Sequence, residues 1–142
     1  MKNPQDVFNI FEHDENFREI MKRLLEASIA ESFNGVLITG ADPGYPIVYA
    51  NDAFSQMTGY RPDEVIGKSP AMLQGPKTDP AVLDRLGEDL AAGRTFHGRA
   101  VNYRKDGAEF IMEWKIVPIR NEAGKTSHYL AIQKESRENT SF

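Results

Sequence analysis

Apolar residues near the amino terminus recur at intervals of three or four, which is the spacing of one face of an α-helix. Asn16 stands at the expected N-cap, and Glu19 follows three residues later. The pattern predicts an amphipathic helix over residues 17–31, and its apolar stripe must be covered. The domain's own sheet and a second copy of the chain are the two alternatives, which the residues favour equally. The stripe consists of Phe17, Ile20, Met21, Leu24, Leu25 and Ile29.

Five shorter runs rich in β-branched and aromatic residues follow, each bounded by turn formers. Two sequential strands are expected at residues 35–39 and 47–51, separated by a loop that contains Pro and Gly. The later runs predict two hairpins in series. Their strands are expected at residues 97–104, 109–119 and 127–134.

Between these two groups of strands the apolar spacing becomes helical again. Short helices are predicted at residues 52–58 and 62–66, and a longer one at 79–92. Pro80 lies in the first turn of the longer helix, where a missing N–H does no harm, and Gly93 marks its end. Strands, then helices, then strands predict an α+β fold with an antiparallel sheet and short helices on one face.

The chain is expected to form one domain with two flanking segments. Its 142 residues are enough to bury a core without metals or disulfides. We expect a flanking segment with the amphipathic helix at residues 1–33, the domain at 34–134 and a polar tail at 135–142.

Charge and composition narrow the classes of function. The formal net charge is −4, and Lys and Arg are scattered along the chain, so the basic surface that nucleic acid requires is missing. No segment has the length and apolarity of a membrane span or a signal peptide, which predicts a cytoplasmic protein without membrane contact. The chain has no Cys, so no thiol can react with a ligand or bind a metal.

Catalytic and metal-binding patterns are also missing from the sequence. His13, His97 and His128 are far apart and lack companions at metal-ligand spacing, and the two later ones are expected on exposed strand faces. No nucleophile sits on a glycine elbow, and no glycine loop is suited to phosphate. We therefore expect a protein that is not an enzyme.

Several short motifs in fixed order resemble one known family. Together they are similar to PAS domains, and specifically to their light-oxygen-voltage (LOV) branch, over residues 34–134. The resemblance implies the PAS fold, with a five-stranded antiparallel sheet, and a role as a sensor. The motifs are Ala50-Asn51-Asp52-Ala53-Phe54, Thr58-Gly59-Tyr60, Glu64-Val65-Ile66-Gly67, Leu73-Gln74-Gly75-Pro76, Thr78-Asp79-Pro80 and Asn102-Tyr103-Arg104-Lys105-Asp106-Gly107.

The resemblance also implies a pocket. In LOV domains two Asn and one Gln face the polar edge of a flavin, and Asn102 and Gln133 match two of these positions. Met112 stands at the third, and Trp114 points into the same cavity by strand alternation. Gln74 resembles the residue that contacts the ribityl chain. The expected pocket is built from Asn51, Asn102, Met112, Trp114 and Gln133, with Gln74 near its mouth. The alternative is plain core, with the amides bonded to backbone or to a trapped water.

Other positions depart from the branch. Pro70 stands where LOV domains carry the photoactive Cys, and it is expected to start a short helix capped by Ser69. Ala71 and Gly87 replace the arginines that hold the flavin phosphate. These departures suggest a different ligand or none, although FMN and FAD stay candidate cofactors. The candidates to replace the missing positive charge are Lys68, Lys77 and Arg85.

The leading hypothesis is a PAS sensory module that couples a small-ligand pocket to the packing of flanking helices. We expect a homodimer through the N-terminal helix and a sheet face, and a downstream signalling partner. The first alternative is a flavin-binding redox or blue-light receptor that works without a cysteine adduct, with Trp114 or a nearby Tyr as electron donor. The second is a ligand-free dimerisation adaptor whose cavity is filled by Trp114 and Met112.

Overall fold

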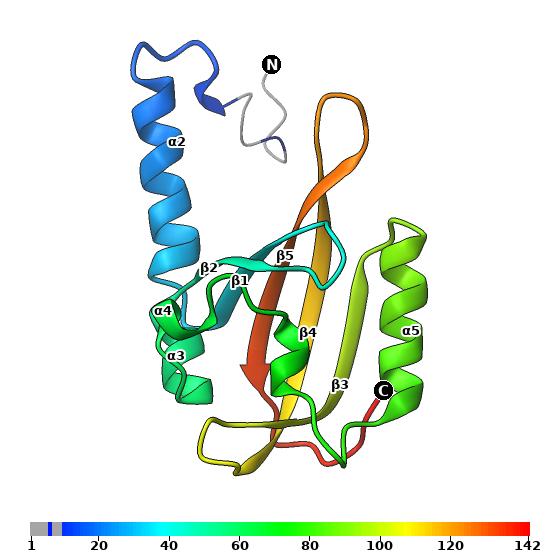
Figure 1. Cartoon of the computed structure of the whole chain (residues 1–142). Coiled ribbons are helices and arrows are strands. Elements are labelled where there is room, and N and C mark those ends of the chain that lie inside the picture. Colours follow the sequence, from blue (N-terminus) through cyan, green and yellow to red (C-terminus); the bar gives the residue numbers. More distant parts are fainter. Residues whose placement is uncertain (1–5, 7–9) are drawn as a thin grey trace.

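A five-stranded antiparallel sheet forms the centre of the molecule in the computed structural model, which describes residue 6 and residues 10–142 (Figure 1). The spatial order of the strands is β2-β1-β5-β4-β3. All five predicted strands are confirmed, with ends that differ by at most one residue. The strands are β1 (Gly35–Gly40), β2 (Ile47–Ala50), β3 (Phe96–Tyr103), β4 (Glu109–Arg120) and β5 (Thr126–Glu135).

The connection between β2 and β3 carries four helical segments. Ser69 Oγ accepts a hydrogen bond from Ala71 N–H at 3.1 Å, which caps the 3₁₀ helix expected to begin at Pro70. Gly59 ends the first helix in the left-handed region, at φ +81°, where a side chain would be strained. The segments are α3 (Asp52–Thr58), α4 (Pro62–Val65), η2 (Pro70–Leu73) and α5 (Pro80–Ala91).

Strand alternation decides which residues face the helices. On β4, Met112 and Trp114 are buried, whereas Glu113 and Lys115 point to the opposite face. Trp114 pairs with Gln133 on β5 and with Gly98 on β3. The buried side of the sheet therefore carries the expected pocket residues of β4 and β5.

The amphipathic helix is present, but it differs from the prediction in two ways. It runs as α2 (Phe17–Leu25) and continues as a π-helical segment, η1 (Glu26–Ala30). Asn16 makes no capping bond with its side chain. No residue of α2 is buried, and the helix projects beyond the sheet (Figure 1). In this single chain, α2 therefore does not bury its apolar stripe on the domain's own sheet.

Residues 136–142, which the sequence predicts to be a polar tail, pack along the free edge of β3, and we call them the C-terminal strap. Arg99 N–H donates to Phe142 O at 3.0 Å, and Phe142 N–H donates to Arg99 O at 2.9 Å. The Phe142 ring lies over the Arg99 guanidinium, 4.5 Å from ring centroid to Cζ. Ser141 Oγ donates to Asp79 Oδ2 at 2.6 Å, which joins the strap to the start of α5.

Candidate functional site

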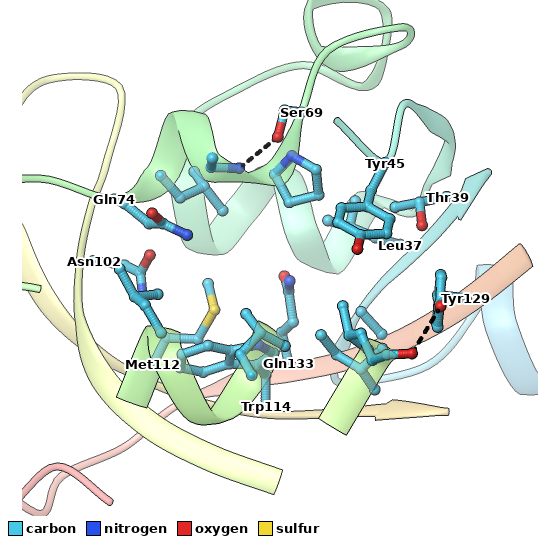
Figure 2. A pocket seen from close by; sticks show the side chains of 18 of the residues that line it. Leu37, Thr39, Tyr45, Ser69, Gln74, Asn102, Met112, Trp114, Tyr129 and Gln133 are labelled. Atoms are coloured by element: carbon cyan, nitrogen blue, oxygen red, sulfur yellow. Dashed lines mark hydrogen bonds between the residues drawn. The ribbon is translucent and has the colours of Figure 1, made fainter. Parts of the chain in front are cut away.

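A cavity of about 360 Å³ lies between the buried face of the sheet and the segments η2 and α5 (Figure 2). Liquid water occupies about 30 Å³ per molecule, so the cavity is much larger than the space of one trapped water. Its size is that of a small-ligand pocket. Its lining consists of Leu37, Thr39, Gly44, Tyr45, Ser69, Pro70, Ala71, Leu73, Gln74, Leu83, Leu86, Gly87, Leu90, Asn102, Met112, Trp114, Ile116, Tyr129, Ala131 and Gln133.

Three amide side chains gather at one part of this cavity. Figure 2 shows Gln74 and Asn102 facing each other, with Gln133 beside them. Asn102 and Gln133 are each 4% exposed, whereas Gln74 is exposed and stands at the opening, as the sequence predicted. Among the described residues, the Asn102 amide has one hydrogen-bond partner, Ala100 O, at 3.5 Å. Its hydrogen-bonding capacity is therefore largely unused.

Gln133 carries the clearest signal of a missing partner. Its Oε1 is buried and accepts no hydrogen bond from the part of the chain that the structure describes. A buried polar atom without a partner costs about 1–3 kcal/mol. An amide that served only to satisfy nearby backbone would be paired, so this oxygen is available to an N–H or O–H group inside the cavity.

Met112 and Trp114 form an apolar wall next to the amides. The Trp114 ring packs against Phe96 with centroids 5.3 Å apart and an angle of 49° between the planes. Both Met112 and Trp114 are buried, and a cavity nevertheless remains beside them. These two side chains therefore line the space without filling it, which argues against the adaptor alternative in the form that requires a filled cavity.

Two tyrosines close the end of the cavity away from the amides (Figure 2). The rings of Tyr45 and Tyr129 meet edge to face, with centroids 5.6 Å apart. The Tyr129 hydroxyl donates to Leu90 O at 3.4 Å, and burial, with a smaller effect from Tyr45, raises the pKa of that hydroxyl. Tyr129 is therefore an uncharged group across the whole physiological pH range.

The opening of the cavity is fixed to the sheet by the turn between η2 and α5. Thr78 Oγ1 accepts from Gly75 N–H at 3.0 Å and donates to Val101 O at 2.7 Å. A Cβ on Gly75 would lie 2.3 Å from the ring of Tyr103, so only glycine allows this close approach. These contacts hold the segment that carries Gln74 against β3.

Asn51 is a correction to the expected pocket, because it does not line the cavity. Its Oδ1 accepts from Val36 N–H at 2.8 Å and from Phe54 N–H at 3.0 Å. Its Nδ2 donates to Ile29 O at 2.8 Å and to Asn34 O at 3.0 Å. The side chain caps α3 and ties η1 to β1. It is a fully paired structural amide, in contrast to Gln133.

Charged groups are missing from the cavity. Among the described residues, those that line it include no Lys, Arg, His, Asp or Glu. Two of the cations expected to replace the lost arginines are occupied elsewhere: Lys77 Nζ lies 3.2 Å from Glu109 Oε1, and Arg85 donates to His97 O at 2.8 Å. Lys68 is exposed and does not line the cavity.

The site therefore fits one part of a flavin nucleotide better than the other. Asn102 and the unpaired Gln133 Oε1 suit the polar edge of a flavin ring, which both donates and accepts hydrogen bonds. The phosphate would find no cation in the lining.

Sequence reasoning missed the tyrosine end of the cavity and the contribution of α5. Leu83, Leu86 and Leu90 line the cavity from α5, and their helical spacing was the available signal. Tyr45 comes from a loop, which has no periodicity to reveal it. Of the described residues, none belongs to a helix long and apolar enough to cross a membrane.

The expected positions of two histidines on exposed strand faces are confirmed. His97 and His128 are both exposed. His97 Nε2 lies 2.8 Å from Glu113 Oε2, and this hydrogen bond is the main reason why the pKa of Glu113 is below its usual value.

Comparison with known proteins agrees with this geometry. Residues 33–138 match the family model of the PAS domain. The chain is 40% identical to phototropin-2 of Oryza sativa subsp. japonica and 42% identical to the bacterioopsin transcriptional activator of Halobacterium salinarum. The matches cover 77% and 84% of this chain but only 12% and 18% of those proteins, so the chain spans less than a fifth of their length. A light-oxygen-voltage domain studied with a flavin analogue superposes with a TM-score of 0.73 at 33% identity, over 84% of this chain and 86% of that one.

Proposed function

This chain belongs to the PAS domain family, and on that premise we propose that it is a sensory module in which ligand occupancy of the internal cavity changes the packing of flanking segments. One observation carries the proposal above all. Gln133 lies on β5, in the middle of the sheet, and its buried Oε1 has no hydrogen-bond partner among the described residues. A ligand that donates to this oxygen would remove the cost of an unpaired buried acceptor. Its binding would therefore favour one conformation of β5, the strand that bears Gln133.

The position of Gln133 gives a short route from the cavity to both flanking segments. Gln133 pairs with Gly35, the first residue of β1, which follows the N-terminal helix. It also lies two residues before the end of β5, where the C-terminal strap begins. Asn51 adds a second link, because it bonds both Ile29 O and Val36 N–H. A shift of β5 can therefore move both flanking segments.

The test uses freshly purified full-length protein and two variants. Each sample is denatured, and any released molecule is identified by mass spectrometry. Gln133→Leu removes the unpaired oxygen without leaving a large void, and we expect the ligand to be lost or at least tenfold weaker. Ile132→Val, on the opposite face of the same strand, is the matched control and should retain the ligand. Equal ligand content in all three proteins would count against the proposed role of Gln133.

A flavin-based redox or blue-light receptor is the second candidate, and two observations favour it. Several relatives are phototropins or blue-light-activated histidine kinases. Asn102, Gln133 and Trp114 line the same cavity, and the two amides would suit the edge of a flavin ring. A bound flavin would supply the light absorption and the electron chemistry, while these residues would orient the ring. The visible absorption of oxidised flavin in the purified protein would support this candidate, and a colourless protein after incubation with riboflavin, FMN and FAD would reject it.

Dimerisation and output complete the proposal. Leu25 of α2 is 58% exposed, and Phe33, between η1 and β1, is fully exposed. A second copy of the chain would cover these apolar groups, together with Ile132 on the sheet face. We place the output on other segments or partners, because the relatives match this chain over only a small share of their length. A cytoplasmic location and a role without catalysis stay predictions from the sequence.

A further inference from the structure

We propose that the cavity selects an uncharged, largely apolar ligand with one hydrogen-bonding edge, and that it discriminates against the phosphorylated form of the same molecule. This inference rests on the proposed function, since it describes the ligand of the same site. A flavin nucleotide would not be such a ligand, because its phosphate needs positive charge in the site.

The first argument is the balance of charge inside the cavity. None of the described residues that line it carries a charge, and the surrounding wall is mostly aliphatic and aromatic. Moving an ionised group from water to such a site is strongly unfavourable unless an opposite charge receives it. An uncharged ligand avoids that cost.

The second argument concerns the opening, where a phosphate could remain close to water. Ala71 and Gly87 line the cavity and are exposed, so they stand at its rim. Neither offers a donor side chain. Gly87 is flanked on α5 by Glu88 and, one turn earlier, by Asp84, both of them exposed. Neither Asp84 nor Glu88 lines the cavity, and neither brings positive charge to its rim.

The third argument comes from the polar groups that remain available. The Tyr129 hydroxyl donates to Leu90 O, whereas the Ser69 hydroxyl accepts from Ala71 N–H and keeps its own hydrogen available to a ligand. The unpaired Gln133 Oε1 and the weakly bonded Asn102 amide both line the cavity. A ligand that satisfies them needs both donors and acceptors along one edge, with an apolar body against Met112 and Trp114.

Riboflavin and FMN are the matched probes, since they differ by one phosphate. Each is titrated into the ligand-free protein, and binding is followed by the quenching of flavin fluorescence. We expect riboflavin to bind at least about tenfold more tightly than FMN, equivalent to about 1.4 kcal/mol. FMN binding as tight as riboflavin, or tighter, would overturn the inference.

A rim variant tests whether charge is the cause. A Cβ built on Gly87 meets nothing within 4 Å, so Gly87→Arg has room for its side chain and also removes a glycine from the interior of α5. It should raise the ratio of the FMN affinity to the riboflavin affinity about tenfold or more. Gly87→Gln is the uncharged control of similar shape. If Gln improves FMN binding as much as Arg does, the charge argument fails.

The remaining outcomes separate this inference from the proposed function. If the protein binds neither flavin but releases a small molecule on denaturation, the charge of that molecule is the test. A neutral molecule supports the inference, and an anionic molecule overturns it. A protein that binds neither flavin and releases nothing removes the proposed sensory function as well. A preference for FMN would overturn the inference about ligand charge and leave the proposed sensory function intact.

Discussion

Two buried amides on neighbouring elements have opposite roles because their hydrogen bonds differ. Asn51 uses both ends of its amide on four backbone groups, at 2.8–3.0 Å. Gln133 leaves its carbonyl oxygen unpaired in the wall of a cavity. Paired buried amides stabilise a fold, whereas an unpaired one is a cost that a ligand can remove. This contrast separates a structural residue from a candidate contact.

Replacement of Asn51 tests the structural half of this contrast. Asn51→Ala removes the cap of α3 and leaves buried backbone groups without partners, so we expect the free energy of unfolding to fall by about 2–4 kcal/mol. Urea denaturation measures the loss. Asn51→Asp keeps the acceptor for Val36 and Phe54 but sets an oxygen against Ile29 O and Asn34 O, so it should also be destabilised. A loss below about 0.5 kcal/mol in the Ala variant, the usual size for a neutral surface change, would contradict the assignment.

Residue-level prediction from the sequence succeeded where strand alternation set the side chain's direction. Trp114 was placed in the cavity wall by a period of two counted from Met112, whereas Met112 and Gln133 were placed there by the family resemblance, and all three line the cavity. Asn51 was wrongly predicted to line the cavity. It follows the last residue of β2 and directly precedes α3, and its side chain caps that helix. Tyr45 lies in a loop and has a positive φ of 50°, a conformation that no pattern predicts.

At the level of elements, the structure differs most from the prediction at the two ends of the domain. The predicted helix over 17–31 becomes α2 followed by a π-helical segment, since Glu31 N–H bonds Glu26 O. Helical periodicity does not reveal such a change of hydrogen bonding. The strap was predicted as a tail because its residues are mostly polar. Its contacts depend on Arg99 and Asp79, which are distant in sequence, so local patterns carry no signal for them.

The junction between the strap and α5 predicts a dependence on pH. The hydrogen bond from Ser141, and secondarily that from Ala81 N–H, hold the pKa of Asp79 below its usual value. A pKa lower in the folded state means that the stabilisation is fully present above the ordinary Asp pKa of about 4, and is lost as the pH falls through the folded-state pKa. The contact between the strap and α5 should therefore weaken in acid, while the contacts between Arg99 and Phe142 remain.

The variant Ser141→Ala tests this junction. Loss of the hydroxyl should move the pKa of Asp79 upward, toward its usual value, and the strap should be less protected at every pH because its contact with Asp79 is gone. NMR titration of the Asp79 carboxyl carbon measures the first effect, and hydrogen exchange of the Arg99 amide measures the second. Thr140→Ala is the neighbouring control. An unchanged Asp79 titration in Ser141→Ala would show that the hydroxyl does not hold the carboxylate in solution.

On the scale of the whole molecule, the cavity and the exposed apolar groups are on different parts of one sheet-based domain. The cavity lies on the helix-covered face, whereas α2 projects from the side and leaves its stripe partly exposed (Figure 1). β5 connects these parts, because it pairs with both β1 and β4 and leads into the strap. A sensor needs such a connection between an internal site and an external surface.

Self-association is the prediction at this scale. The wild-type chain should form a dimer through α2, and Leu24→Glu, which places a charge in the apolar stripe, should weaken it at least tenfold. Analytical ultracentrifugation over a range of concentrations measures the dissociation constant. Lys22→Glu changes an exposed residue outside the stripe and is the matched control. A monomeric wild type, or a Leu24→Glu variant that dimerises normally, would show that α2 does not form the interface.

We infer that the cavity holds a small molecule bonded to Gln133, and mass spectrometry of the intact protein under non-denaturing conditions is the decisive experiment. We expect a species heavier than the chain by one small molecule per chain, which returns to the bare mass on denaturation. A bare chain under both conditions, in protein that has never been unfolded, would contradict the claim and leave the domain without a resident ligand.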